Sequence, residues 1–209
     1  MMRFALLLFL SLCAPFSALA ESHVPLARAF DTMRTGDWSG ARTIASDVSP
    51  IAYDLIEWHR LREGKGTAEE VMLFLDLNPD WPGLDWLRKK SEPAMLDASD
   101  ADIMLFFKED LPQTAQGAMA HARALKAIGQ NGSAEAGLVL AWRSMAIGPS
   151  THTKMLAQYG DLLKEHHIAR LDMVLWKDWD KNIQRMIPLV PEGYQKLAKA
   201  RMGLRAQGH

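Results

Sequence analysis

The sequence predicts an all-α protein: an α-superhelix of short antiparallel helix hairpins, a tetratricopeptide-like solenoid without a β-sheet. Apolar residues recur at helical spacing, and turn-forming residues interrupt them roughly every ten to fifteen positions. No stretch alternates apolar and polar residues with the β-branched enrichment of a strand. Two similar segments far apart in the chain indicate a repeat. Arrays of such short helices bury a continuous core only when neighbouring hairpins stack on one another.

The first 20 residues are predicted to be a secretory signal peptide rather than part of the fold. Arg3 supplies the positive charge, residues 4–12 are apolar apart from Ser11, and Ala18-Leu19-Ala20 forms the cleavage site. The alternative is lipoprotein processing at Cys13, for which Leu12 is too bulky at the preceding position. We expect cleavage before Glu21, which leaves an α-superhelical domain of residues 21–209. Because Cys13 is the only cysteine, that domain would contain no disulfide and no thiolate site.

The first three helices are predicted between Pro25 and Arg62. Proline suits the first turn of a helix, and Gly36 ends this one. The second helix starts near Trp38 and ends at Pro50, and the third covers residues 51–62. The side chains expected to face inward are Leu26, Ala29, Phe30 and Met33, then Ala41, Ile44, Ala45 and Val48, then Leu55, Trp58 and Leu61.

Capping residues predict the starts of the helices that follow, and glycine or proline predicts their ends. Thr67 and Glu70 have the spacing of a capping box. The expected spans are 67–77, 99–112, 114–129 and 133–148, with Thr67, Ser99, Thr114 and Ser133 as caps. Breaks near Gly160, residues 166–167, Asp178 and residues 188–191 divide the rest into three or four helices. Such short helices with short connections suit antiparallel neighbours.

The stretch N-P-D-W-P-G-L-D-W, residues 78–86, combines prolines with tryptophans. Such a combination is compatible with a sugar-stacking platform or with a corner where two helices pack. Asn78-Pro79 ends one helix, and Leu84 and Leu87 begin the next one against the core. We therefore expect corner packing.

The repeat consists of residues 30–38, F-D-T-M-R-T-G-D-W, and residues 171–179, L-D-M-V-L-W-K-D-W. Pro50 and Pro191 follow the two segments at the same distance. The separation is about four times the 34-residue period of tetratricopeptide-type helix pairs. Residues 122–142 have the small-residue skeleton that allows two helices to approach closely.

The composition and motifs predict no active site, cofactor or metal site. The formal net charge of −1 gives no indication of nucleic acid or an anionic membrane as partner, and no apolar run after residue 20 is long enough to span a membrane. Glu165, His166, His167 and Asp172 form the best superficial metal cluster, but adjacent helical residues point about 100° apart, so a polar helix junction is expected. Residues 62–67, R-E-G-K-G-T, lack the order of a phosphate-binding loop and predict a turn followed by a cap.

Carboxylates and tryptophans are also expected to be structural. The candidate acids are at helix ends or on polar faces, where capping and dipole interactions favour them. They are Asp97, Asp100, Asp102, Glu69, Glu70, Glu109 and Asp110. Core packing is expected for the tryptophans, Trp38, Trp58, Trp81, Trp86, Trp142, Trp176 and Trp179, because large aromatics dominate core energetics.

Five stretches taken in order resemble a known family. They are residues 21–42, 52–64, 69–92, 106–142 and 159–191, with N-P-D-W-P at 78–82 and R-L-D-x-x-L-W at 170–176 the most specific blocks. Together they resemble the N-terminal superhelical region of soluble lytic murein transglycosylases, and the resemblance covers about residues 24–209. It implies a periplasmic protein of doughnut-shaped helical body that acts on peptidoglycan. The family cleaves the MurNAc–GlcNAc β-1,4 bond without water, gives 1,6-anhydro products and uses one glutamate of a Glu-Ser motif in a lysozyme-like domain.

The resemblance provides no catalytic residue for this chain. Its only Glu-Ser pair is Glu21-Ser22, at the predicted cleavage point, and the lysozyme-like domain is expected to be absent, as in a truncated chain. We therefore expect an inactive scaffold portion of a lytic transglycosylase, with glycan strands and cell-wall proteins as partners. The alternative is a stand-alone periplasmic tetratricopeptide-like protein-interaction module.

Overall fold

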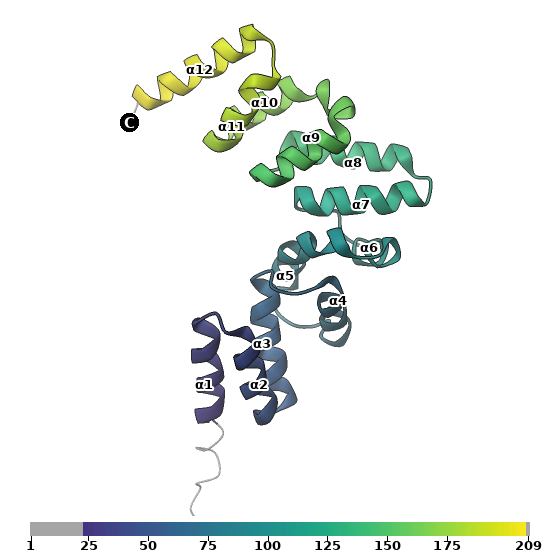
Figure 1. Cartoon of the computed structure of the whole chain (residues 1–209), viewed down its shortest axis with the longest axis vertical. Coiled ribbons are helices and arrows are strands. Elements are labelled where there is room, and N and C mark those ends of the chain that lie inside the picture. Colours follow the sequence, from purple (N-terminus) through teal and green to yellow (C-terminus); the bar gives the residue numbers. More distant parts are fainter. Residues whose placement is uncertain (1–22, 208–209) are drawn as a thin grey trace, which may run out of the picture. The chain divides into compact units, whose positions relative to one another are not determined.

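The computed structural model describes residues 23–207, and within this range the chain is all-α, as predicted (Figure 1). The predicted signal peptide, Cys13 and Glu21-Ser22 lie outside the described residues. No strand occurs between residues 23 and 207, and no helix there is long and apolar enough to span a membrane. The elements are α1 (His23–Arg34), α2 (Trp38–Val48), α3 (Pro50–Arg62), α4 (Ala68–Leu77), α5 (Leu84–Ser91), the 3₁₀ helix η1 (Glu92–Asp97), α6 (Asp100–Phe106), α7 (Ala115–Ala127), α8 (Asn131–Ser144), α9 (Pro149–Lys164), α10 (His167–Trp176), α11 (Asp180–Met186), the 3₁₀ helix η2 (Ile187–Leu189) and α12 (Glu192–Gln207).

The helices form two compact units, divided within α3 between His59 and Arg60. In the first unit, α1 and α2 make an antiparallel hairpin whose core is largely alanine. The buried residues are Ala29, Ala41, Ala45, Ala52 and Ile56. Small side chains let the helix backbones approach closely, and the larger Leu26, Phe30, Met33, Ile44 and Val48 pack around them.

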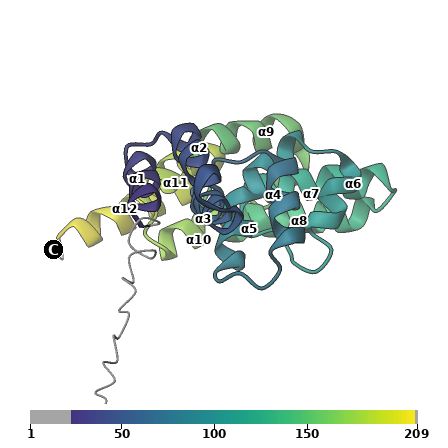
Figure 2. The ribbon, with the colours of Figure 1, turned by 90° about the horizontal axis from the view of Figure 1, so that it is seen from below.

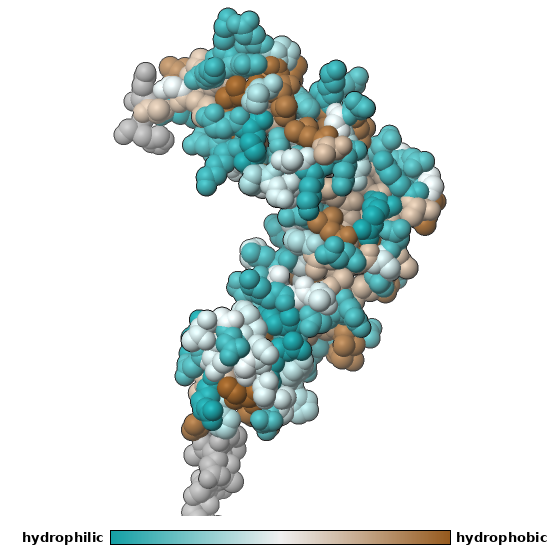
Figure 3. Space-filling model, viewed as in Figure 1, coloured by the Kyte–Doolittle hydropathy of each residue, from teal (hydrophilic) through white to brown (hydrophobic). Residues whose placement is uncertain are grey.

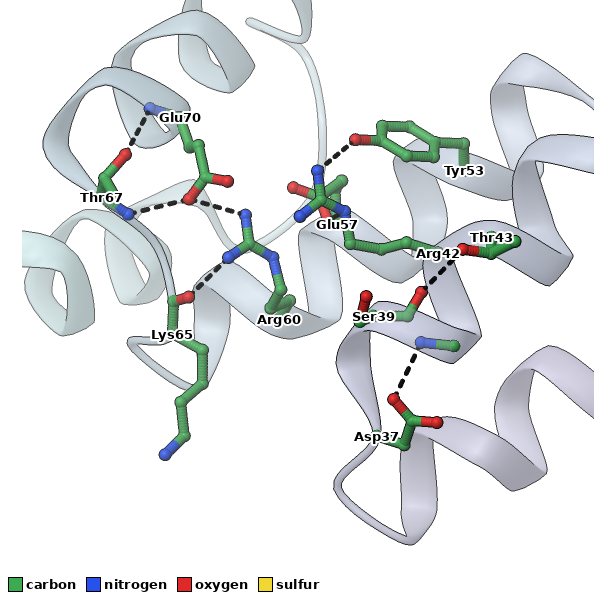
Figure 4. A network of polar contacts seen from close by, with 11 residues as sticks. Asp37, Ser39, Arg42, Thr43, Tyr53, Glu57, Arg60, Lys65, Thr67 and Glu70 are labelled. Atoms are coloured by element: carbon green, nitrogen blue, oxygen red, sulfur yellow. Dashed lines mark hydrogen bonds and ion pairs between the residues drawn. The ribbon is translucent and has the colours of Figure 1, made fainter.

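Polar side chains of the first unit connect α2 with α3 (Figure 4). Arg42 extends from α2 and donates to the hydroxyl of Tyr53 at 2.6 Å, and its Nε lies 2.8 Å from a carboxylate oxygen of Glu57. Asp37 caps α2 by accepting a hydrogen bond from Gly40 N. These contacts set α3 against the preceding hairpin within this unit.

The second unit begins with the corner that the capping box predicted. The side chains of Thr67 and Glu70 each accept a hydrogen bond from the other residue's backbone N–H (Figure 4). The carboxylate of Glu70 also lies 2.9 Å from the guanidinium of Arg60. Arg60 in turn donates to the carbonyl of Lys65. These contacts make a tight connection from α3 into α4. The predicted capping box of α4 is confirmed.

The main core of the second unit lies among α7 to α12. The α7/α8 hairpin is the best-packed pair, and both ribbon views show the two helices side by side (Figures 1 and 2). Its interface combines small residues with a large one, the fully buried Trp142 of α8. The buried core residues include Ala122, Ala134, Leu138, Met155, Leu163, Leu171, Val174 and Ile183.

The predicted repeat corresponds to equivalent local structures in the two units. Residues 30–38 end α1 and lead into α2, and residues 171–179 end α10 and lead into α11. Pro50 starts α3, and Pro191 accepts the first backbone hydrogen bonds of α12. The aspartates differ in role, because Asp37 caps a helix whereas Asp178 has a positive φ of 56° and pairs with Arg205.

Several helix boundaries differ from the prediction: α1 already begins at His23, α6 already ends at Phe106, and two further differences have a clear cause. Ser133 is not the cap of α8, because the helix already begins at Asn131 and Gln130 precedes it. The left-handed Gly129, with φ of 79°, reverses the chain early enough for α8 to start before the serine. The break expected near Gly160 is a kink, since α9 continues past it and only Tyr159 leaves helical geometry.

Candidate functional site

The side chains of residues 165–172 that were weighed as a metal cluster lie in different surroundings. His167 is buried, and its ring lies tilted against Trp142 with centroids 5.5 Å apart, whereas His166 is only half-buried and precedes α10. Asp172 pairs with Arg201 at 2.8 Å. Between residues 23 and 207, no group of three His, Cys, Asp or Glu side chains is placed to hold a metal ion.

The R-E-G-K-G-T segment is a turn, as expected. Gly64 has a φ of 70°, and a Cβ there would lie 2.9 Å from the carbonyl oxygen of Lys90. Glycine is therefore required by conformation and by the close approach of the α5 backbone. The segment leads directly into the Thr67 cap.

Most of the candidate carboxylates take part in caps and exposed ion pairs. Asp102 accepts a hydrogen bond from the hydroxyl of Ser99, and Asp100 pairs with Arg123 at 2.9 Å. Glu109 lies 3.2 Å from Lys108, while Glu69 and Asp97 are exposed. The structure gives none of these groups the burial that would make it a general acid.

Glu92, which the sequence did not single out, is a buried acid whose hydrogen-bond partners lie at the start of a helix. Its side chain is 2% exposed and accepts hydrogen bonds from Gln113 N, Thr114 N and the Thr114 hydroxyl at 2.6–2.7 Å. Burial raises the pKa of the Glu92 carboxyl, and the hydrogen bonds from Thr114 and Gln113 limit that rise. Since Thr114 is the N-cap of α7, Glu92 fixes the start of that helix.

A buried cluster of one arginine and two histidines surrounds Trp142. The Arg170 guanidinium is completely buried, lies 4.6 Å from the Trp142 ring centroid, and donates to the carbonyls of Trp142 and Met145 and to Asn182 Oδ1. Among the described residues, no carboxylate forms an ion pair with it. The carbonyls belong to the C-terminal end of α8, where the helix dipole favours positive charge. Burial and the nearby Arg185 lower the pKa of Arg170 to about 10, so it remains charged at neutral pH.

His152 contacts the same tryptophan from α9, with ring centroids 5.2 Å apart. Burial, followed by the charges of Arg170 and Arg185, lowers the pKa of His152 to about 4. The histidine is therefore neutral at pH 7. The cluster has large pKa shifts, but none of the cavities described below is lined by its residues.

The tryptophans divide into packed and exposed residues. Trp142 is the core residue that was predicted, and four others are half-buried. For Trp86 and Trp176, which are 48% and 76% exposed, the prediction of core packing was wrong. Lys90 lies over the Trp86 ring at 5.0 Å, and Trp176 lies at the exposed C-terminal end of α10. The helical spacing of apolar residues did not indicate that Trp176, at the end of α10, faces solvent.

The best candidate for a binding site is a cavity of about 450 Å³ formed by residues 79–88 and the segment after α6. We call it the Trp81 pocket; its lining is Pro79, Trp81, Gly83, Leu84, Asp85, Arg88, Glu109 and Asp110. Phe74 supports the Trp81 ring edge-to-face, with centroids 5.5 Å apart. Gly83 takes a left-handed φ of 66° at the start of α5, which directs the chain around the pocket.

Charged groups line the other side of the Trp81 pocket. Arg88 pairs with Asp110 at 3.2 Å, donates to the carbonyl of Phe106, and so joins α5 to α6. Asp85 and Glu109 are exposed. Carboxylates accept hydrogen bonds from hydroxyl groups, and an indole ring offers an apolar contact surface, so the pocket suits a polyhydroxylated ligand. The corner predicted for residues 78–86 is therefore both a packed corner and one wall of a cavity.

Two other cavities are predominantly apolar. One, of about 390 Å³, lies along α7 and α8 and is lined by small residues such as Ala118, Ala122 and Gly137. The other, of about 440 Å³, lies between α10 and α12. Neither carries the combination of a tryptophan and carboxylates found in the Trp81 pocket.

Comparison with protein-family models, curated proteins and solved structures found no match for this chain.

Proposed function

We propose that the chain is a scaffold portion of a periplasmic peptidoglycan lytic transglycosylase, which holds glycan strands and does not itself cleave them. The ordered sequence blocks that resemble the soluble lytic murein transglycosylases support this proposal, and so does the hairpin array that they form. The observation that carries it is the Trp81 pocket, because the N-P-D-W-P block of the resemblance forms its wall.

We infer that the chain does not cleave glycan from the positions of its two acids with raised pKa, Glu92 and Asp54. Glu92 is held by three hydrogen bonds at a helix start. Burial, followed by the charge of Glu57, raises the pKa of Asp54 on α3. Neither acid lines any of the three cavities described above. A lytic transglycosylase needs an acid that reaches the glycosidic oxygen.

Co-sedimentation with purified peptidoglycan sacculi tests the binding. We expect the chain to sediment with sacculi and Trp81→Ala to weaken binding about tenfold, which corresponds to about 1.4 kcal/mol. Asp85→Ala is the second variant, because Asp85 is exposed and its removal leaves the Phe74–Trp81 packing intact. Trp86→Ala is the matched control, since Trp86 is an exposed tryptophan five residues further along the chain that does not line the pocket.

Two results would contradict the proposal. If the Trp81 and Asp85 variants sediment as fully as the control, the pocket does not hold the glycan. If the chain alone releases 1,6-anhydro-muropeptides from sacculi, it is an enzyme and not a scaffold.

The second candidate is a periplasmic tetratricopeptide-like module that binds a protein. The large apolar side chains exposed on α10 and α12 favour it, because such surfaces commonly mark protein interfaces. Absence of sedimentation with sacculi, together with tight binding of a purified cell-wall protein, would favour this function over the first.

A further inference from the structure

Helices α10 and α12 expose an apolar surface that no described residue of the second unit covers. Five of its large side chains are between 37% and 76% exposed, namely Ile168, Trp176, Tyr194, Leu197 and Leu204. Three of them line the cavity of about 440 Å³ between the two helices, which we call the α10/α12 groove. Figure 3 shows hydrophobic surface where α12 meets α10. A surface of this kind is typical of an association site.

The apolar side chains of α12 have the spacing of a helix–helix seam. Leu197 and Leu204 are seven residues apart and therefore share one face, with the small exposed Ala200 between them. A Cβ added at Gly193, one turn before Leu197, would meet no atom within 4 Å. The seam is thus open along the helix, and it alternates small and large residues as the buried α7/α8 interface does.

The two helices run parallel and carry opposite charges on the groove. Arg201 pairs with Asp172, and Arg205 pairs with Asp178, so residue numbers rise in the same direction along both helices. The groove side of α10 presents Asp172 and the nearby Glu165. Helix α12 contains four cations and one acid, which are Lys196, Lys199, Arg201, Arg205 and Glu192.

We propose that the α10/α12 groove is the interface of a two-fold dimer, with a second copy of this chain as its occupant. A two-fold axis along the groove places α10 of each copy over α12 of the other. Asp172 of α10 then faces Arg201 of α12 twice, and the apolar seams meet at the centre. A pairing of α12 on α12 would instead bring the cations of both copies together.

The carboxylate of Asp172 has capacity for this second contact. Asp172 is 73% exposed despite its ion pair with Arg201, and a carboxylate has about four acceptor positions. In the dimer it would also face Arg201 of the second copy. The intrachain pair thereby becomes one half of a four-membered ionic network, and the exposed leucines supply the apolar contact.

Light scattering coupled to gel filtration, over a concentration series of the full chain, tests this inference. We expect the mass of two chains at high concentration. Leu204→Arg should weaken the dimer at least about tenfold, because a charge would enter the apolar seam. Leu77→Arg is the matched control, since Leu77 is 68% exposed and Leu204 is 69% exposed. Ala200→Arg should also weaken the dimer, because Ala200 lies on the seam. Ala206→Arg should not weaken it, because the exposed Ala206 lies about half a turn around the helix from Leu204.

A charge exchange tests the arrangement. Asp172→Lys and Arg201→Glu should each weaken self-association, since each variant alone faces a like charge across the axis. A mixture of the two variants should restore the dimer, because each copy then offers the charge that the other lacks. A monomer at all concentrations, unchanged association of Leu204→Arg, or no restoration on mixing would overturn the proposal.

Discussion

The contact between Glu92 and Gly117 permits a sharp prediction about stability. Gly117 lies in the first turn of α7, directly beneath the buried carboxylate. A Cβ at this position would lie 2.7 Å from Cδ of Glu92 and closer still to Oε2. Gly117→Ala must therefore displace a side chain that is held by three hydrogen bonds.

The magnitude follows from those bonds. Hydrogen bonds to a charged group contribute about 1.5–3 kcal/mol each, and a shifted carboxylate would keep some of them. Alanine regains about 0.5–1 kcal/mol of helix propensity over glycine. We expect a net loss of about 3 kcal/mol, which lowers the melting temperature by about 6–12 °C in a chain of this size.

Thermal unfolding followed by circular dichroism measures the effect. Gly137→Ala on α8 is the matched control, because a Cβ at Gly137 would meet nothing within 4 Å and the change should stabilise the chain slightly. The double variant with Glu92→Ala separates the steric clash with the Glu92 carboxylate from the change in helix propensity. Gly117→Ala should no longer destabilise the chain once the carboxylate has been removed. If Gly117→Ala is as harmless as Gly137→Ala, or equally costly without the carboxylate, our interpretation of this contact is wrong.

Two further predictions concern protonation and capping. The pKa of His152 is lowered from 6.5 to about 4 in the folded chain. Between these two pH values the unfolded chain binds more protons than the folded chain does. The free energy of unfolding therefore falls as the pH falls from 6.5 to 4, by about 3 kcal/mol in total. His152→Phe should reduce the fall in melting temperature between pH 7 and pH 4, and an unchanged fall would contradict this assignment. Thr67→Ala should cost about 1 kcal/mol through loss of the capping box, whereas Ser133→Ala should cost almost nothing, and equal losses in urea unfolding would show that Ser133 acts as a cap after all.

The parts of the fold that were predictable from sequence are those determined within a few residues. The Thr67 and Ser99 caps and the glycine turn at Gly64 depend on side chains and φ angles at the site itself. Ser133 shows the limit of that reasoning, because Gly129 reverses the chain before the serine is reached. Local signals therefore predict that a helix exists better than they predict its first residue.

The candidate sites depended on contacts that sequence spacing does not reveal. Glu92 reaches Thr114 across 22 residues, and Arg170 reaches the carbonyl of Trp142 across 28. Trp81 and Trp86 lie in one short segment, yet only Trp81 lines the pocket. Which side of a helix faces a neighbour is set by the stacking of hairpins, and a periodic pattern alone does not specify that neighbour.

The buried charges of the second unit indicate where function should be sought. Because α7 and α8 are antiparallel, the start of α7 and the end of α8 lie at the same end of their hairpin. Glu92 satisfies free N–H groups at the positive end of the α7 dipole, and Arg170 satisfies free carbonyls at the negative end of α8. The sign of each buried charge thus matches the helix end that it contacts, and this explains their burial without a substrate. Perturbed pKa values often mark active sites, but the raised pKa of Glu92 and the lowered pKa of Arg170 accompany contacts with helix ends. Ligand binding is then expected at the Trp81 pocket and association at the α10/α12 groove, where carboxylates and apolar side chains are exposed to solvent.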